Sequence, residues 1–141
     1  MGGLMSRNKG KRGEREIIDM LQPVVTQVRE ELGLRPLVLK RNTLQSDGGG
    51  CDVAGLRWLA LEIKLHAKPQ VNAWWAQTLE QSEEGGEPVL AYRCDRQRWK
   101  FRLWASLGHG LVAAAEVGEE EFLLWFRRRL THECIKEMND A

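Results

Sequence analysis

The run from Trp58 to Leu65 constrains the fold of this chain more than any other segment, because it is apolar except at Glu62 and Lys64. A short apolar run of this kind predicts a β-strand that is buried on both faces. The two charged residues are two positions apart, so their side chains leave the strand on the same face. Burying charged groups costs several kcal/mol unless each is paired or binds a metal. The sequence therefore predicts a charged site within a sheet.

A long helix is expected upstream of this strand, from about residue 8 to residue 32. Gly33 supplies its stop signal, and Pro23 should kink or interrupt it midway. The apolar positions recur at intervals of three and four residues, which is the spacing of one buried helix face. They are Ile17, Ile18, Leu21, Val25, Val28 and Leu32.

Shorter strands are expected between this helix and the charged strand. Residues 37–41 form an apolar run, and the polar, glycine-rich segment 42–50 cannot continue it, so we expect a strand followed by a loop. Residues 51–54 form another short run, joined to the charged strand through Gly55. This pattern predicts that residues 51–54 and 58–65 pair as a hairpin.

The second half of the chain alternates helical and strand-like segments. We expect a helix over 71–84, a hairpin from the runs 88–94 and 99–105, a short strand over 111–117 and a closing helix from about 119. This order predicts an α/β fold with a mixed central sheet flanked by helices. We expect a single domain over residues 9–141, preceded by a flexible basic arm at 1–8.

Composition excludes several classes of protein. The 141 residues are 43% hydrophobic and 29% charged, which is typical of a globular domain. The net charge of +1 gives no general argument for a nucleic-acid partner, although basic residues gather at positions 7–12 and 127–129. The three cysteines have no metal-binding spacing, and there is no apolar leader or membrane span, so we expect a cytoplasmic protein.

Asp52 is the expected partner of the charged strand. Pairing of the predicted hairpin would bring its carboxylate within several ångströms of Glu62. A hard divalent cation such as Mg²⁺ would relieve the repulsion between the two carboxylates. Lys64 beside that metal could orient or activate a water molecule that attacks a phosphate. The pattern therefore points to phosphodiester hydrolysis, while a solvated Lys-Glu pair is the plain alternative.

Glu14 adds a third acid by a separate route. It lies three, four and seven residues before Ile17, Ile18 and Leu21, so it shares their buried helix face. An acid in that position should point toward the sheet and could complete the metal site. Arg15 and Asp19 fall outside this stripe and should be exposed.

Six short segments between residues 9 and 105 occur in an order and spacing that are typical of a known family. They are Lys9–Glu16 (KGKRGERE), Val38–Arg41 (VLKR), Gly50–Ala54 (GCDVA), Leu61–Lys64 (LEIK), Gly85–Ala91 (GGEPVLA) and Arg98–Phe101 (RWKF). Together they resemble the archaeal-type Holliday junction resolvases of the PD-(D/E)xK superfamily. The resemblance implies a restriction-endonuclease-like fold and a homodimer that cuts opposing strands of a four-way DNA junction.

The resemblance also implies roles for individual residues. Glu14, Asp52, Glu62 and the backbone carbonyl of Ile63 would hold Mg²⁺, for which Mn²⁺ should substitute, and Lys64 would act on the attacking water. No organic cofactor is expected. The residues expected to contact DNA are Arg7, Lys9, Lys11, Arg12, Arg15 and Arg41.

The chain departs from this family in the long segment 42–50 and in the helix after residue 118, and we expect a phage or bacterial version. Two other functions stay open: a general or site-selective double-stranded DNA endonuclease, and a DNA-binding module that does not cut. Trp74 and Trp75 are expected to pack in the core or against a second copy, with stacking on unpaired bases as the alternative. Gln77 could reach the metal centre.

Overall fold

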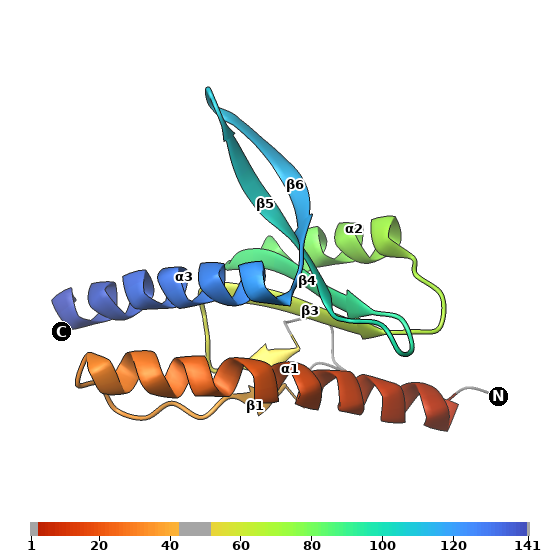
Figure 1. Ribbon diagram of the computed structural model, residues 1–141, viewed down its shortest axis with the longest axis horizontal. Helices are drawn as coiled ribbons and strands as arrows, with labels where there is room; N and C mark the ends of the chain where they lie inside the picture. Colours follow the sequence, from red (N-terminus) through yellow and green to blue (C-terminus); the bar gives the residue numbers. More distant parts are fainter. Residues whose placement is uncertain (1–2, 43–51, 141) are drawn as a thin grey trace.

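The computed structural model describes the backbone of residues 3–42 and 52–140, and the side chains in these ranges from Gly10 onward. Three helices surround two sheets in these ranges (Figure 1). In chain order the elements are α1 (Gly3–Glu31), β1 (Lys40–Arg41), β2 (Val53–Ala54), β3 (Leu59–Leu65), α2 (Val71–Ser82), β4 (Glu87–Arg93), β5 (Lys100–Gly108), β6 (Leu111–Val117) and α3 (Glu119–Asn139).

The main sheet has four strands in the order β3-β4-β5-β6, and β1 and β2 form a separate antiparallel pair. Strands β3 and β4 are parallel because α2 crosses over between them, whereas β4, β5 and β6 are joined by hairpins and run antiparallel. The prediction of an α/β fold with a mixed central sheet flanked by helices is therefore confirmed.

Alternating residues of β4 separate the two faces of the sheet. Val89 and Ala91 belong to the larger core, which α1 and α3 cover, and Leu90 and Tyr92 pack with Trp74 and Trp75 of α2 on the other face. Four residues of the predicted stripe of α1, Ile17, Leu21, Val25 and Val28, are within 2% of full burial. Its other two members, Ile18 and Leu32, are partly buried, and Val24 and Arg29 are buried outside the stripe. In α3, Phe122 stacks on Phe101 of β5. The expected core packing of the two tryptophans is confirmed.

Helix α1 is longer and less interrupted than the sequence indicated. It begins at Gly3, so residues 3–8 are helical where we expected a flexible arm, and it runs through Pro23 to Glu31. The segment before residue 9 contains Leu4, Met5 and Arg7, which favour helix and let it extend toward the N-terminus. Pro23 is exposed, so the backbone carbonyl that lacks a partner there lies on the solvent side of the helix.

The expected pairing of residues 51–54 with the charged strand is wrong for most of its length. β2 pairs with β1 instead, in the register Lys40 with Ala54 and Arg41 with Val53. Among the described residues 52–54, Asp52 contacts β3 and donates its backbone N–H to the Leu61 carbonyl over 2.9 Å. Gly55, at a φ of 120°, and the turn after it direct the chain away from a tight hairpin, so the backbone groups of β2 are satisfied by β1.

The other elements lie close to their predicted positions. The expected β4–β5 hairpin, the strand over 111–117 and the closing helix from 119 are confirmed, whereas the strand expected over 37–41 is ordered as a strand only at Lys40–Arg41. Residues 43–51, including Cys51 and most of the expected loop, lie outside the described part of the chain. No helix among the described residues has the length and apolar character needed to cross a membrane.

Candidate active site

Glu62 and Lys64 lie together on β3, as the spacing predicted. Their neighbours Leu61 and Ile63 belong to the core under α1 and α3, so the charged pair is on the face turned toward α2. Lys64 Nζ is 3.4 Å from Glu62 Oε1, and the two side chains are only 20% and 5% exposed. The strand is buried on both faces, so Glu62 is buried, and Lys64 is the one residue of β3 that is partly accessible.

Asp52 is held against the open edge of β3. Its backbone N–H donates to the Leu61 carbonyl over 2.9 Å, and its Oδ2 accepts the N–H of Ile63 over 2.6 Å. The carboxylate is almost completely buried. A short hydrogen bond from a backbone amide favours the charged form of a carboxylate. The contact therefore fixes Asp52 beside Glu62 without the full hairpin that we had expected.

The electrostatics of Glu62 show that negative charge is concentrated at this edge. Burial, the charge of Asp52 and a smaller contribution from Glu14 together raise the pKa of Glu62 to about 7, although Lys64 opposes them. The protein thus makes ionisation of Glu62 unfavourable, and one cation from Lys64 does not compensate for the surrounding carboxylates. A group with such a strongly shifted pKa is typical of a functional site.

Glu14 points toward the sheet from α1 and pairs with Arg41 of β1. Arg41 donates from Nε to Glu14 Oε2 over 2.5 Å, and both side chains are mostly buried. Glu14 is close enough to influence the pKa of Glu62, so the four predicted catalytic residues gather in one region. Arg41 was expected to contact DNA. In this structure its guanidinium is paired with the Glu14 carboxylate. The sequence contained no signal for this pairing, because the two residues belong to different elements.

Close contact between α1 and β3 depends on Gly13. A Cβ atom at this position would lie 3.3 Å from Leu65 Cβ and 3.4 Å from Ile63 Cγ2. The absence of a side chain therefore lets the helix backbone lie directly on the strand. This approach places the next residue, Glu14, beside the charged end of β3.

A second group of interactions, which the sequence did not reveal, braces the same part of α1. Glu16 accepts hydrogen bonds from Arg93 Nη2 over 2.9 Å and from Trp99 Nε1 over 3.2 Å, and Arg93 lies over the Trp99 ring. Burial opposes ionisation of Glu16, but the hydrogen bonds and the charges of Arg93 and Arg12 outweigh it and lower its pKa. Glu16 thus ties α1 to the end of β4 as a charged group.

The oxygen atoms at the edge of β3 include two kinds of metal ligand. Asp52 and Glu62 supply carboxylates, and the Ile63 carbonyl faces the same edge because the N–H of Ile63 points there to Asp52. Among the described residues, however, no three His, Cys, Asp or Glu side chains converge closely enough to form a ready-made metal cluster. The oxygen atoms available at this edge are thus those of two carboxylates and a carbonyl, while Glu14 is paired with Arg41.

The expected DNA-binding residues lie mainly along the first half of α1. Lys11, Arg12 and Arg15 are exposed there, and Arg12 also lies 3.7 Å from Glu16. Arg7 and Lys9 belong to the same helix, but their side chains are outside the described part. Asp19 is exposed, as the stripe predicted, and Gln77 of α2 is half-buried.

The basic cluster near the C-terminus is largely tied to the protein itself. Arg127 donates to Gln27 over 2.7 Å. Arg129 pairs with Glu133 over 3.0 Å and lies over the Trp58 ring. These two residues therefore hold α3 against the rest of the fold, and only Arg128 is exposed.

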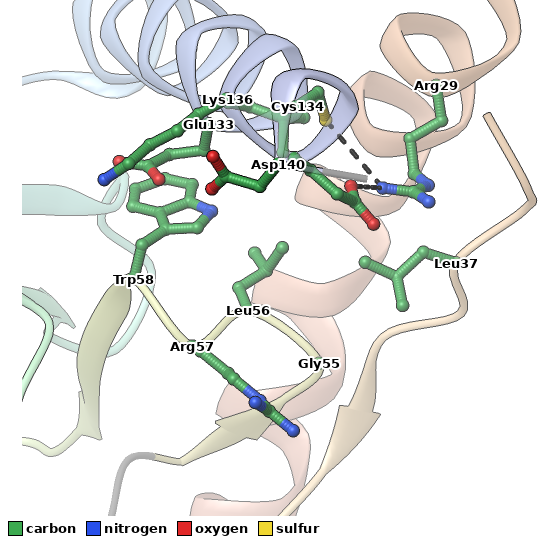
Figure 2. A pocket seen from close by; sticks show the side chains of 12 residues that line it. Arg29, Leu37, Gly55, Leu56, Arg57, Trp58, Glu133, Cys134, Lys136 and Asp140 are labelled. Carbon is green, nitrogen blue, oxygen red and sulfur yellow. Dashed lines mark hydrogen bonds and ion pairs between the residues drawn. The ribbon is translucent and has the colours of Figure 1, made fainter. Parts of the chain in front are cut away.

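A pocket of about 570 Å³ lies away from the candidate site, between the ends of α1 and α3 and the turn at 55–58 (Figure 2). Arg29 crosses it and pairs with Glu137 over 3.0 Å, while its Nη1 also contacts Cys134 Sγ (Figure 2). Its lining combines acidic and basic side chains, and none of the four predicted catalytic residues is among them. The pocket therefore adds nothing to the chemistry at β3.

No protein-family model matches the sequence, and no curated protein gives a significant match. Among solved structures, the chain is similar to Hjc of Archaeoglobus fulgidus, described as a Holliday junction resolvase from an archaeal hyperthermophile. The TM-score is 0.43 at 19% sequence identity, and the match covers 79% of this chain and 85% of Hjc. A likeness of this degree does not assign an activity.

Proposed function

We propose that this chain is a Mg²⁺-dependent endodeoxyribonuclease that hydrolyses DNA phosphodiester bonds, with four-way junctions as its main substrate. The observation that carries the proposal is the buried pair Asp52 and Glu62 beside Lys64 at the edge of β3. Buried carboxylates whose ionisation is penalised lower the stability of the folded state, so their presence indicates that they bind a ligand or take part in a reaction.

The donor atoms fit a hard cation. Asp52, Glu62 and the Ile63 carbonyl offer oxygen ligands only, and Mg²⁺ is usually bound by one or two carboxylates together with water and phosphate oxygens. Burial and the charge of Asp52 raise the pKa of Glu62 to about 7, and a bound cation would favour its charged form. Mg²⁺, once bound, would neutralise charge on the phosphate that is being cleaved. Mn²⁺ shares these ligand preferences and should replace it.

Each protein residue has a distinct task in this proposal. Asp52 is fixed by the Ile63 amide, so it presents its remaining lone pairs in a defined direction. Lys64 is placed by Glu62 at 3.4 Å, where its ammonium group can orient a water molecule against a phosphate. Glu14 is paired with Arg41. If Arg41 binds a DNA phosphate instead, the Glu14 carboxylate could hold a second water molecule or bind the metal.

The exposed basic residues of α1 would hold the DNA backbone. Lys11, Arg12 and Arg15 lie on the segment that leads to Glu14, so phosphates bound along the helix would pass close to the edge of β3. Such contacts position a duplex without reading its sequence. Binding should therefore weaken steeply with salt and show little sequence preference.

The test is cleavage of labelled four-way junctions and of linear duplexes with the same arm sequences, in the presence of Mg²⁺ and in EDTA. Asp52→Asn and Lys64→Ala should each reduce cleavage by at least about a hundredfold, as for residues that act directly on the reaction. Asp19→Asn and Lys68→Ala are matched controls, because both residues are exposed.

Paired nicks at the junction, lost in both site variants and kept in both controls, would support junction resolution. Preferential cutting of the linear duplex would favour a general endonuclease of the same chemistry. Binding without cleavage would favour a DNA-binding module, and equal cutting by the wild type and the site variants would refute the proposed centre.

A further inference from the structure

The hairpin of β5 and β6 extends beyond the rest of the sheet as a two-stranded ribbon (Figure 1). β4 pairs with β5 only from Lys100 to Leu103. Past Leu103, β5 pairs with β6 alone, up to the contact of Gly108 with Leu111. We call residues 103–115 the ribbon.

The ribbon is uncharged and apolar, although 29% of the whole chain is charged. Residues 103–115 contain no Asp, Glu, Lys or Arg. Their large apolar side chains are nevertheless exposed: Trp104 by 36%, Leu107 by 60%, Leu111 by 57% and Val112 by 56%. Contiguous exposed apolar surface of this kind marks an interaction site, whereas single exposed apolar residues are ordinary.

The edge of β6 also indicates an interaction site. β6 is the end strand of the sheet, and its sequence Leu111–Val117 (LVAAAEV) has no proline and no lysine to discourage a further strand. A two-stranded ribbon is marginally stable by itself in water, and a third strand on its edge would stabilise it. The edge of the ribbon can therefore pair with another strand.

The chemistry of the ribbon selects among possible partners. A surface without lysine or arginine lacks the groups that bind phosphates, which disfavours DNA. An uncharged apolar strand is best complemented by another uncharged apolar strand, and the same segment of a second molecule satisfies this in an isologous contact. We propose that two copies of this chain associate through the ribbon, with β6 of one copy antiparallel to β6 of the other.

The sequence of β6 suits pairing with itself. If Ala114 lies at the two-fold axis, Ala113 faces Ala115 of the second copy, so small side chains meet at the centre. Val112 then lies opposite Glu116, and no like charges face each other. Glu116 is already hydrogen-bonded by the Tyr92 hydroxyl within its own chain.

This arrangement would also position the two candidate centres. An antiparallel pair has its two-fold axis perpendicular to the sheet, so equivalent faces of the two copies lie on the same side and the two β3 strands lie at opposite edges of the combined sheet. Each copy contributes four strands, so seven spacings of roughly 4.8 Å place the two β3 strands about 34 Å apart. The inference supplies the partner of the proposed junction nuclease, but it rests on the ribbon and not on the chemistry at Glu62.

The experiment is sedimentation velocity of the full chain without DNA, over a range of concentrations. The wild type should sediment as a dimer, and the double variant Val112→Asp, Ala114→Asp should have half that mass. Val38→Asp and Leu124→Asp are matched controls and should stay dimeric, because these apolar side chains are exposed outside the ribbon. Thermal melting of every variant shows whether it is folded.

Two single variants test the pairing itself. Val112→Lys should retain more dimer than Val112→Asp, because residue 112 faces Glu116 of the second copy. The opposite order would overturn the β6–β6 pairing. Both side chains replace a residue that is more than half exposed, so neither change should prevent folding.

Other outcomes would overturn the proposal. A wild type that stays monomeric at every concentration, or a double variant that stays dimeric, contradicts it. A monomeric wild type whose junction binding is lost in the double variant would instead assign the ribbon to DNA. Asp52→Asn should remain dimeric whether or not the chain is a nuclease, so failure of one proposal is distinguishable from failure of the other.

Discussion

Arg41 Nε lies 2.5 Å from Glu14 Oε2, and this ion pair joins the middle of α1 to β1. The two side chains are 29% and 15% exposed, so water weakens the interaction only in part. The pair has two consequences: it contributes to the stability of the metal-free protein, and it keeps Glu14 occupied at the rim of the candidate centre.

The first prediction concerns the energy of this pair. A double-mutant cycle with Glu14→Gln and Arg41→Met, followed by urea unfolding, should give a coupling energy of about 1 kcal/mol in favour of the pair. The same cycle with Arg15→Met in place of Arg41→Met should give no coupling, because Arg15 is exposed. Equal coupling in both cycles would contradict a specific contact.

Metal binding should depend on pH through Glu62. The pKa of Glu62 is raised to about 7, mainly by burial, and a carboxylate must lose its proton to bind a metal. We expect the thermal stabilisation by Mg²⁺ to be small below pH 7 and to increase above it. Glu62→Gln should remove most of this stabilisation at every pH. A wild-type effect that does not change across pH 7 would show that Glu62 is not a ligand.

Without metal, the same residue should lower stability at high pH. The folded pKa of about 7 is above the ordinary value of 4.5, so the folded state binds the proton more tightly than the unfolded state. The contribution of this group to the free energy of unfolding is therefore greatest below pH 4.5. It falls by on the order of 3 kcal/mol as the pH rises through 7. In EDTA at high pH, urea unfolding should show Glu62→Gln to be more stable than the wild type. A less stable variant would mean that the charge of Glu62 is compensated.

Gly13 and Gly10 offer a matched comparison on one helix. Gly10→Ala should raise the free energy of unfolding by about 0.5–1 kcal/mol, since alanine favours helix and a Cβ atom there meets nothing within 4 Å. At Gly13 the same gain is opposed by a contact at 3.3 Å with Leu65 Cβ. Gly13→Val should be destabilising by about 1–3 kcal/mol.

The two glycines should also differ in activity. Displacing α1 from β3 moves Glu14 relative to Glu62. Gly13→Ala should therefore lower cleavage and Gly13→Val should lower it more, while Gly10→Ala leaves it unchanged. Cleavage rates under saturating Mg²⁺ provide the measurement. A Gly13→Val protein with wild-type cleavage would show that the close helix–strand contact does not matter for the site.

Local periodicity accounts for the parts of the structure that were predicted well. The three- and four-residue spacing of Ile17, Leu21 and Val25 identifies the buried face of α1 wherever the helix packs. Likewise, alternation along a strand places Glu62 and Lys64 on one face whichever strand pairs with β3. These properties depend only on neighbouring residues, so the chain's own pattern determines them.

The choice of partners was not predictable in the same way. Whether residues 53–54 pair with β1 or β3 depends on how the turn after Gly55 directs the chain, and both pairings would satisfy the same backbone groups. The pairs of Arg41 with Glu14 and of Arg93 with Glu16 join residues from different elements, and many other cations in the sequence could have served.

The sequence by itself thus determined that Glu62 and Lys64 share one face of a buried strand and that Glu14 lies on the buried stripe of α1. Only the tertiary structure decided that Asp52 is fixed by the Ile63 amide, that Arg41 neutralises Glu14, and that residues 103–115 project as a ribbon. The physical reason is that the direction of a side chain follows from backbone geometry a few residues long, whereas its partner depends on which segments the folded chain brings together.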